Sequence, residues 1–317
     1  MTDLRSKSFS FRAISGIWIF LILSGIGIIG GAFSVFGAET ADVVDYRTFF
    51  GFDPRTTVWI IAELHLMFGA FVLGVPMFAV TVEYVGVLTK EERYDRLAKD
   101  FTRLLSASFA LTAALGGLLT FALFTLYPKV MTFMSGIFHE SFYIYAFFFF
   151  GETFVLYFYY YSWDRLKKRK GIHITAGVLL NIIGLIIMGI SNSWATYMMS
   201  PSGIDPETMK FTGTLMDAIW NPLWNPLNLH RILGNAVFGG YVAGAYAAVK
   251  FLTAQTDEDR AHYDWMGYVG NFIAIVSLLF LPFAGYYLGR EVYSFSPIMG
   301  NNMMGGAFSW TFIIQAI

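Results

Sequence analysis

The sequence has no cysteine among its 317 residues. Disulfides, iron–sulfur clusters and covalently attached c-type haem all depend on cysteine sulfur, so the sequence excludes these three kinds of site. Any redox cofactor must therefore be held by histidine, methionine or carboxylate side chains.

Charged residues are also scarce, at 14% of the chain, whereas a soluble domain has about 25%. Hydrophobic residues make up 56% and aromatic residues 19%, and the mean hydropathy is +0.57. These values place most of the chain in lipid. The net charge of −1 predicts no nucleic-acid partner.

Long apolar runs account for this composition. Each run is about 20 residues or longer, enough to cross roughly 30 Å of hydrocarbon as a helix. They lie at about 13–36, 57–88, 104–127, 140–162, 173–199, 228–252 and 264–288, and an eighth begins near 306. The sequence therefore predicts an all-α, polytopic transmembrane bundle of about eight helices.

The two ends of the chain differ from the middle. The run at 13–36 follows basic residues, as a secretory signal would, but it is longer than a signal's apolar core. We expect a retained anchor helix with an outer loop over 1–55 and the main bundle over 56–317. About a dozen residues remain after 306, so we expect the C-terminal part of the bundle to be short or missing.

Lysine and arginine predict the orientation. Fifteen of them fall on one side of the predicted helices and five on the other. The larger set includes 90–103 ("KEERYDRLAKDFTR") and 165–170 ("RLKKRK"). Because cytoplasmic loops are enriched in basic residues, we predict a multi-pass membrane protein with a cytoplasmic N-terminus. His230 then lies at the outer end of its helix.

Few ionisable residues fall inside the predicted spans: Glu63, His65, Glu83, Glu152, His230 and Arg231. A charge at the bilayer centre costs about 2.5–3.5 kcal/mol on insertion scales, so such residues tend to face protein or water and to serve a function. We expect Glu83 to lie near the cytoplasmic end, where it reaches water.

The two histidines have two interpretations each. His65 is either a core histidine, paired for instance with Glu63, or a cofactor ligand. His230 is either an interfacial anchor, with Arg231 binding lipid phosphate, or a ligand as well. Two histidines on different helices of a cysteine-free protein are what noncovalent b-type haem requires, and Arg231 could then neutralise a propionate.

Glu152 lies among aromatic residues in the middle of a span. It is either a neutral carboxyl held by a neighbour or a proton carrier. Together with Asn181 and Asn192 it could also line the polar path of a secondary transporter, although the inverted repeats and broken helices typical of that class are not seen.

Several segments in order resemble subunit I of the cytochrome bd quinol oxidases. They are "HLMFGAFVLG" with "VEYVGVLTK", "GETFVLYFYYYSWDRL", "NSWATYMMSPSGIDPETM", "NLHRILGNAVFGGYVAGA" and "GREVYSFSPIMGNNMMGG". No single segment is specific, but their order and spacing over about 56–317 are. The resemblance implies that His230 ligates a low-spin haem b, that His65 ligates the high-spin haem pair where oxygen reacts, and that Glu152 belongs to the proton path. In this interpretation Arg231 supplies the positive charge that neutralises a haem propionate.

The sequence departs from that family in places. A second glutamate of the proton path falls on Ile144, and an acidic position on the preceding helix falls on Phe121. In the segment that opens the quinol loop, polar residues of the family fall on Ser296, Met299 and Met304. Thioethers bond poorly to quinol hydroxyls and accept no protons, which puts quinol oxidation at this place in doubt. The helix at 13–36 is an addition to the family's pattern.

The resemblance implies a haem-bearing subunit in a prokaryotic plasma membrane that passes electrons to oxygen with cytoplasmic proton uptake. It implies at least one haem b, leaves a haem d open, and calls for a second membrane subunit. The donor is then quinol, a cytochrome c or another redox subunit. The alternative is a b-haem electron-transfer or anchor subunit of a larger respiratory complex, without oxygen reduction.

Overall fold

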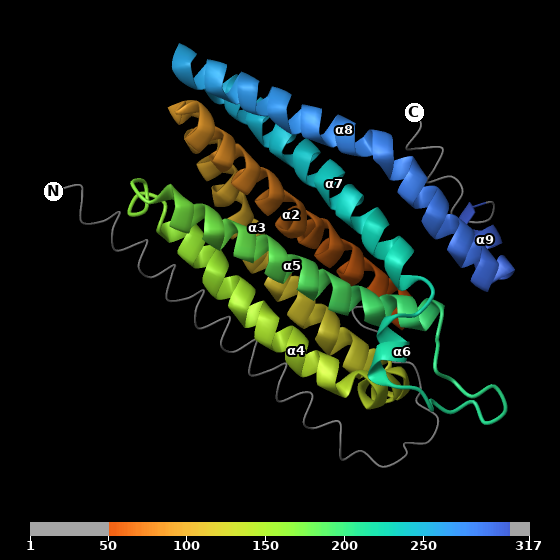
Figure 1. Ribbon diagram of the computed structural model, residues 1–317. Coiled ribbons are helices and arrows are strands. Elements are labelled where there is room, and N and C mark those ends of the chain that lie inside the picture. The colour runs from red at the N-terminus through yellow and green to blue at the C-terminus, as the bar shows by residue number, and fades with distance from the viewer. Residues whose placement is uncertain (1–50, 305–317) are drawn as a thin grey trace. The chain divides into compact units, whose positions relative to one another are not determined.

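The computed structural model describes residues 51–304, which form helices joined by short connections (Figure 1). Six helices are long and apolar enough to cross a membrane: α2 (Pro54–Thr89), α3 (Glu92–Leu126), α4 (Pro128–Tyr161), α5 (Lys170–Met199), α7 (Trp224–Thr253) and α8 (Asp257–Phe295). Two short helices, α6 (Leu215–Ile219) and α9 (Pro297–Met304), accompany them. The predicted all-α transmembrane bundle is confirmed. The predicted span at 13–36 and the one beginning near 306 lie outside the described residues, and the division of the chain at residue 55 stays a prediction.

The chain folds into two compact units. Of the described residues, one unit contains those up to Gly69 together with Ala107–Gly136, and the other contains Ala70–Ser106 together with those from Ile137 to residue 304. In the first unit, the early turns of α2 pack against the end of α3. The buried residues there are Ile61, Ala122 and Leu126, flanked by Val58, Leu119 and Tyr127.

Helix α2 begins where local signals require it. Asp53 accepts a hydrogen bond from the Thr56 backbone N–H at 3.0 Å, which satisfies one of the N–H groups that a helix start leaves unpaired. Pro54 occupies the first helical position, where its missing N–H costs nothing. These two residues fix the start of α2 eleven positions before His65.

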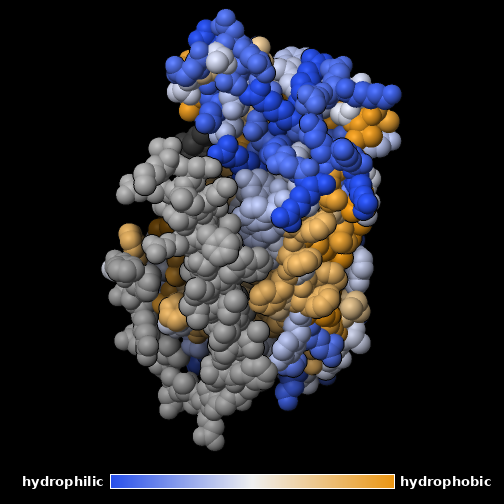
Figure 2. Space-filling view, turned by 90° about the vertical axis from the view of Figure 1, so that its left-hand side faces the viewer, coloured by the Kyte–Doolittle hydropathy of each residue, from blue (hydrophilic) through white to orange (hydrophobic). Residues whose placement is uncertain are grey.

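In the second unit, three basic segments meet at one end. Arg96 Nη2 of α3 lies 2.5 Å from Asp259 Oδ1 of α8, and His262 Nε2 lies 3.0 Å from Asp100 Oδ2. Lys99 of α3 also pairs with Asp164 of the α4–α5 connection at 2.8 Å. We call the end of the second unit that carries the ion pairs of Arg96, Lys99 and His262 the charged end. Figure 2 shows it as the hydrophilic upper part of the surface, above an apolar belt.

The basic segments 90–103 and 165–170 therefore share one end of the second unit, where Lys167 lies 3.3 Å from Glu92. The basic residues near the N-terminus lie outside the described residues. Which side of the membrane this end faces stays a prediction.

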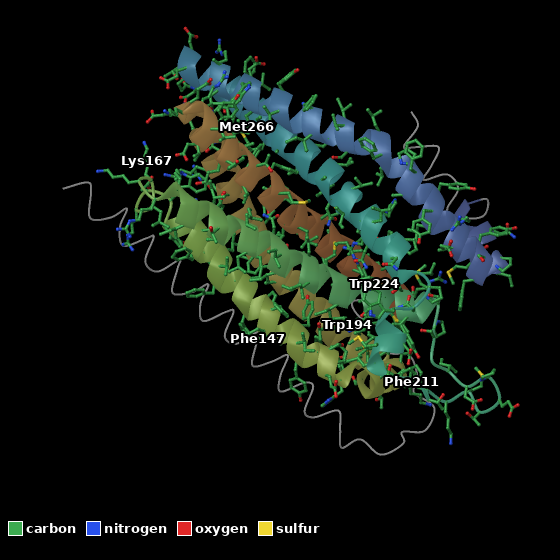
Figure 3. The ribbon with its side chains drawn as sticks, in the orientation of Figure 1. Phe147, Lys167, Trp194, Phe211, Trp224 and Met266 are labelled. Carbon is green, nitrogen blue, oxygen red and sulfur yellow. The ribbon has the colours of Figure 1, made fainter. Side chains whose placement is uncertain are left out.

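Two tryptophans lie at the opposite end of this unit. Trp194 of α5 donates to Ser141 Oγ at 2.9 Å, and Trp224 of α7 donates to the Gly189 carbonyl at 2.8 Å. Figure 3 shows both far from Lys167 of the charged end. Indoles gather at membrane–water interfaces, where one edge is polar and the rest apolar. The two ends therefore have the composition of two interfaces.

The belt between them exposes large apolar side chains. Phe147 and Phe154 of α4 and Phe283 and Tyr286 of α8 are all mostly exposed. Contiguous apolar surface of this kind needs lipid or another protein against it.

Helices α7 and α8 approach closely through glycines. A Cβ added at Gly240 would lie 2.7 Å from the Gly270 carbonyl oxygen and 2.9 Å from Ala274 Cβ. Small residues let transmembrane backbones come together in this way, which replaces the hydrophobic drive that lipid does not provide. This contact holds α7, the helix that carries His230, against α8.

We expect the substitution Gly240→Ala to destabilise the protein by about 1–3 kcal/mol, because the added methyl overpacks this crossing. Gly234→Ala on the same helix is the matched control, since nothing lies within 4 Å of its added Cβ. Thermal unfolding of the two variants in detergent measures the difference. Equal melting temperatures would contradict the close α7–α8 packing.

Candidate functional site

The four residues singled out from the sequence fall on three helices. His65 lies on α2 in the first unit, whereas Glu152 of α4 and the adjacent His230 and Arg231 of α7 lie in the second. Within the described residues, no three His, Asp or Glu side chains are grouped so as to hold a bare metal ion. Single histidines on separate helices suit a porphyrin iron, because the ring supplies four ligands and the protein supplies axial ones.

His65 is oriented by its neighbours in α3. Its Nδ1 lies 3.0 Å from the Thr112 carbonyl oxygen. A carbonyl only accepts, so Nδ1 carries the proton and Nε2 carries the lone pair of the neutral ring. This is the arrangement that haem- and zinc-ligating histidines share, in which the second ring nitrogen is fixed by a backbone carbonyl or carboxylate.

Glycine makes room for this ring. A Cβ added at Gly116 would lie 2.9 Å from His65 Cε1 and 3.3 Å from Nδ1. Glu63 is exposed and stands two positions from His65, so the two side chains do not share a helix face. The partner of Nδ1 is therefore the Thr112 carbonyl, not the Glu63 carboxylate that the sequence suggested for a core histidine.

His230 points across α7 toward α8. A Cβ added at Gly285 would lie 3.7 Å from His230 Nε2, so the backbone of α8 passes close to the imidazole at this glycine. The ring is half-buried near the end of α7 that also carries Trp224. Its place near the start of α7 and the glycine beside its ring suit a histidine that would hold a haem iron near the surface of the membrane.

Arg231 brings a half-buried positive charge next to His230. Its Nη1 donates to Asn192 Oδ1 of α5 at 2.6 Å, and Asn192 Nδ2 donates to Asn228 Oδ1 at 2.8 Å. No carboxylate of the described residues lies within 4.0 Å of the guanidinium. A guanidinium away from water favours an anion beside it, and a haem propionate has the charge and shape to fill that role.

Glu152 is buried, at 5% exposure, and its Oε1 faces Gly184 of α5, where an added Cβ would lie 3.3 Å away. Tyr145, seven residues earlier on α4, lies close enough to interact electrostatically with both Glu152 and Arg231. The asparagines considered for a transporter path have other partners: Asn181 donates to the Gly177 carbonyl at 2.9 Å, and Asn192 holds Arg231.

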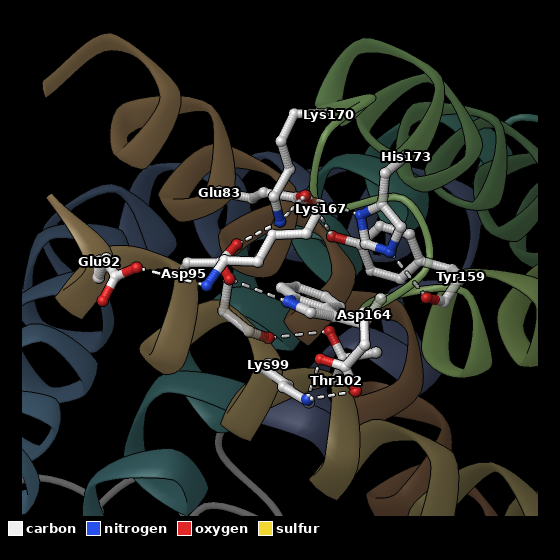
Figure 4. Close-up of polar contacts among 12 residues, drawn as sticks. Glu83, Glu92, Asp95, Lys99, Thr102, Tyr159, Asp164, Lys167, Lys170 and His173 are labelled. Carbon is white, nitrogen blue, oxygen red and sulfur yellow. Dashed lines mark hydrogen bonds and ion pairs between the residues drawn. The ribbon is translucent and has the colours of Figure 1, made fainter. Parts of the chain in front are cut away.

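Glu83 does not reach water, contrary to the expectation from its place near a helix end. It is 1% exposed, and Lys170, Tyr159 and His173 all bond to its carboxylate. The connection between α4 and α5 brings Tyr159 of α4 and Lys170 and His173 of α5 together around this carboxylate (Figure 4). Sequence reasoning missed His173, although the assigned topology put it at the same end of the membrane as Glu83.

The charged end also carries a solvent-facing pair. The hydrogen bond from Lys99 lowers the pKa of the Asp164 carboxyl below its usual value. Asp164 belongs to the "WDRL" segment that the resemblance singled out.

The residues that replace family carboxylates face outward. Ile144 of α4 and Phe121 of α3 are both exposed. Ser296 precedes α9 and its Oγ accepts from the Met299 backbone N–H at 3.3 Å, so it acts as a helix cap. Neither Ile144 nor Phe121 places a polar group in the bundle.

Comparisons with known proteins agree with this picture. The family model described as cytochrome bd terminal oxidase subunit I matches residues 54–306. A Bacillus subtilis (strain 168) protein named "Putative cytochrome bd menaquinol oxidase subunit I" is 24% identical over 218 residues, which are 68% of this chain and 47% of that protein. The chain thus spans about half the length of that relative.

Among solved structures, the bd oxidase from Geobacillus thermodenitrificans is similar, with a TM-score of 0.67 and 20% identity, covering 78% of this chain and 58% of that one. This likeness shows a shared fold. The family match covers most of the chain, including the helices that carry His65, Glu152 and His230. The chain belongs to the cytochrome bd terminal oxidase subunit I family.

Proposed function

We propose that the chain is the haem-bearing subunit of a bd-like terminal oxidase that passes electrons to oxygen and takes protons from the cytoplasm. The observation that carries the proposal is the orientation of His65, whose Nδ1 is bonded to the Thr112 carbonyl and whose Nε2 is thereby the ligating nitrogen. Family membership supports an oxidoreductase in general terms.

Each residue has a separate task in this proposal. His65 would hold the iron of the haem at which oxygen reacts, and His230 would hold the iron of a low-spin haem b near the outer surface. Arg231 neutralises a propionate, and the buried Glu152 holds a proton for the reaction. When bound, the haems supply electron transfer and an open iron position for oxygen. At least one is of b type, and haem d remains a further candidate.

The membrane arrangement follows from the same resemblance. The charged end faces the cytoplasm under the positive-inside rule. A second membrane subunit covers part of the exposed apolar belt, since haem-bearing helices would otherwise face lipid.

A second candidate is supported by the outward-facing Ile144 and Phe121, which stand where the family has carboxylates. In it the same histidines hold b haems that conduct electrons within a larger respiratory complex, or the chain is an anchor, without oxygen reduction.

The two candidates differ in their haem spectra. We expect the purified complex to bind carbon monoxide at a high-spin haem, with the signal lost in His65→Ala and the low-spin b signal lost in His230→Ala. His262→Gln, at the charged end, is the histidine control and keeps both signals. Purely low-spin spectra would favour the electron-conducting subunit.

The space beside His65 gives a finer test. Gly116→Ala forces the imidazole out of its hydrogen bond with Thr112, so we expect roughly 10–100-fold weaker haem retention, the usual cost of losing an orienting partner. Gly117→Ala is the matched control, because nothing lies within 4 Å of its added Cβ. Haem content by pyridine haemochrome after dialysis measures both. Equal retention would contradict the assigned role of the ring.

The proposed donor follows from Met299, whose thioether bonds poorly to quinol hydroxyls and accepts no protons. We expect the complex to oxidise a reduced cytochrome c or another redox subunit faster than quinol, and Met299→Lys to raise quinol oxidation. Oxygen consumption with each donor measures this preference. Brisk quinol oxidation by the native complex would refute the change of donor.

A further inference from the structure

The segment between α5 and α7 forms a loop at the end of the second unit opposite the charged end. It covers residues 200–223, includes the short helix α6, and projects from the ends of the long helices (Figure 1). It contains three acidic residues, Asp205, Glu207 and Asp217, and one basic residue, Lys210. We call residues 200–223 the acidic loop.

Hydrogen bonds fix the shape of the acidic loop. The Asp205 N–H donates to the Lys210 carbonyl at 2.9 Å, which closes the turn at its tip. At its base, Ser200 Oγ donates to Asn221 Oδ1 at 3.1 Å, and both side chains are buried. The loop is therefore a preformed surface, and a partner that binds it loses little affinity to the cost of ordering it.

The aspartates of the loop are held in their ionised form. Asp205 accepts from the backbone N–H groups of Thr208 at 3.1 Å and Glu207 at 2.8 Å, and these bonds lower its pKa below the usual value. The backbone N–H and the hydroxyl of Thr214 lower the pKa of Asp217 in the same way. Three carboxylates against one lysine leave the loop negatively charged.

Large apolar side chains lie in the same loop. Met209 is 73% exposed, Trp220 is 59% exposed and Met216 is 55% exposed. The Met209 backbone has a φ of +54°, which is uncommon for a residue other than glycine, and its N–H bonds to the Asp205 carbonyl at 2.8 Å. Exposed apolar side chains among polar ones are typical of sites that bind another protein.

The acidic loop leads directly into the helix that carries His230. Trp220 packs on Trp224 of α7, with ring centroids 4.4 Å apart, and Trp224 is fixed by its bond to the Gly189 carbonyl. His230 follows six residues later, about 9 Å along the helix axis. A protein bound to the loop would therefore lie near the end of α7 at which His230 stands.

Other charges at this end agree in sign with the loop. Glu140 of α4 is exposed and directly precedes Ser141, which accepts from a tryptophan of this end. Arg290 pairs with the neighbouring Glu291, so this pair adds no net charge. Arg231 is half-buried and lies below the surface. The exposed surface here attracts a cationic partner.

We propose that the acidic loop is the docking surface of a small, soluble electron carrier with a basic face, a protein of the cytochrome c class. This inference rests on the proposed function, in which His230 would hold a low-spin haem. It adds the place at which the donor binds. In each encounter the carrier is oxidised by one electron, the haem that His230 would hold is reduced by one, and no bond forms or breaks.

The chemistry of the surface suits this kind of partner. Opposite charges raise the rate of encounter and orient the two proteins. A carrier has to leave after each electron, and short-lived electron-transfer complexes bury less than about 1,200 Å². A small group of apolar side chains among acidic ones meets both requirements.

Anchoring in lipid is the competing explanation, because tryptophan also gathers at membrane surfaces. In that case Trp220 and Met216 contact headgroups, and the charge of Glu207 has no effect on the binding of a soluble protein. The two explanations therefore differ in how binding responds to the acidic residues.

The experiment measures binding of the intact, haem-loaded complex to an immobilised, lysine-rich cytochrome c by surface plasmon resonance. We expect saturable binding at low salt and its loss in about 1 M salt, where the Debye length is about 3 Å. Acetylation removes the charge of lysine, so we expect cytochrome c with acetylated lysines to bind at least about tenfold more weakly.

Two variants with matched controls locate the surface. Glu207→Lys reverses an exposed charge and keeps the backbone N–H that bonds to Asp205, so we expect about tenfold weaker binding at low salt. Asp264→Lys makes the same change of charge at an exposed position of the charged end and keeps affinity within about twofold. Trp220→Ala removes the largest apolar contact and weakens binding roughly 5–30-fold, whereas Phe154→Ala, in the apolar belt, does not.

The haem spectrum of each variant shows whether it has assembled. If Glu207→Lys does not assemble, the comparison of Trp220→Ala with Phe154→Ala decides alone. Equal affinity within a pair of variant and control, undiminished binding of acetylated cytochrome c, or no binding at low salt overturns the docking surface. A complex that binds through the loop but has no haem that binds carbon monoxide overturns the proposed oxygen reduction and leaves the docking surface standing.

Discussion

The structure depends on how ionisable groups are satisfied inside a hydrocarbon layer. Water is absent there, so each charge or imidazole must find its partner within the bundle or in a bound group. Glu83 meets this requirement completely, with three donors on one carboxylate. Arg231 meets it only with amides and retains a positive charge toward its surroundings. This contrast separates a carboxylate that the bundle satisfies by itself from a guanidinium with no carboxylate partner among the described residues.

The haem proposal follows from the same contrast. His65 and His230 each have a glycine beside the ring, and His65 has one nitrogen fixed by a carbonyl. These features orient the His65 imidazole and bring a helix backbone close to each ring. Glu152 likewise faces a glycine. The fold thus orients the His65 imidazole and buries the Glu152 carboxyl.

Much of the fold could be predicted because lipid imposes a simple pattern. All six of the apolar runs that fall within the described residues are helices, since a lipid-exposed backbone has no other way to pair its polar groups. Their ends were misjudged: α3 begins at Glu92 and not near 104, and α4 at Pro128 and not near 140. Apolar runs mark only the part in hydrocarbon, while the helices continue into the polar interface.

The candidate site was predictable in part. A histidine or carboxylate within an apolar run is visible in the sequence, so His65, Glu152 and His230 could be named. Their partners could not, because Thr112, Gly285 and Asn192 come from other helices and depend on helix rotation. The same limit applies to Glu83, whose burial is caused by His173 and Lys170, about 90 residues away. A sequence shows how deep in the membrane a residue lies, but it does not show which neighbouring helix its side chain faces.

The central claim is that His65 and His230 hold haem iron, and density for the intact complex at near-atomic resolution tests it most directly. The account predicts a porphyrin beside each imidazole, with His65 Nε2 bonded to iron and a propionate against Arg231. Lipid or protein side chains packed against both rings, with no porphyrin, would contradict it.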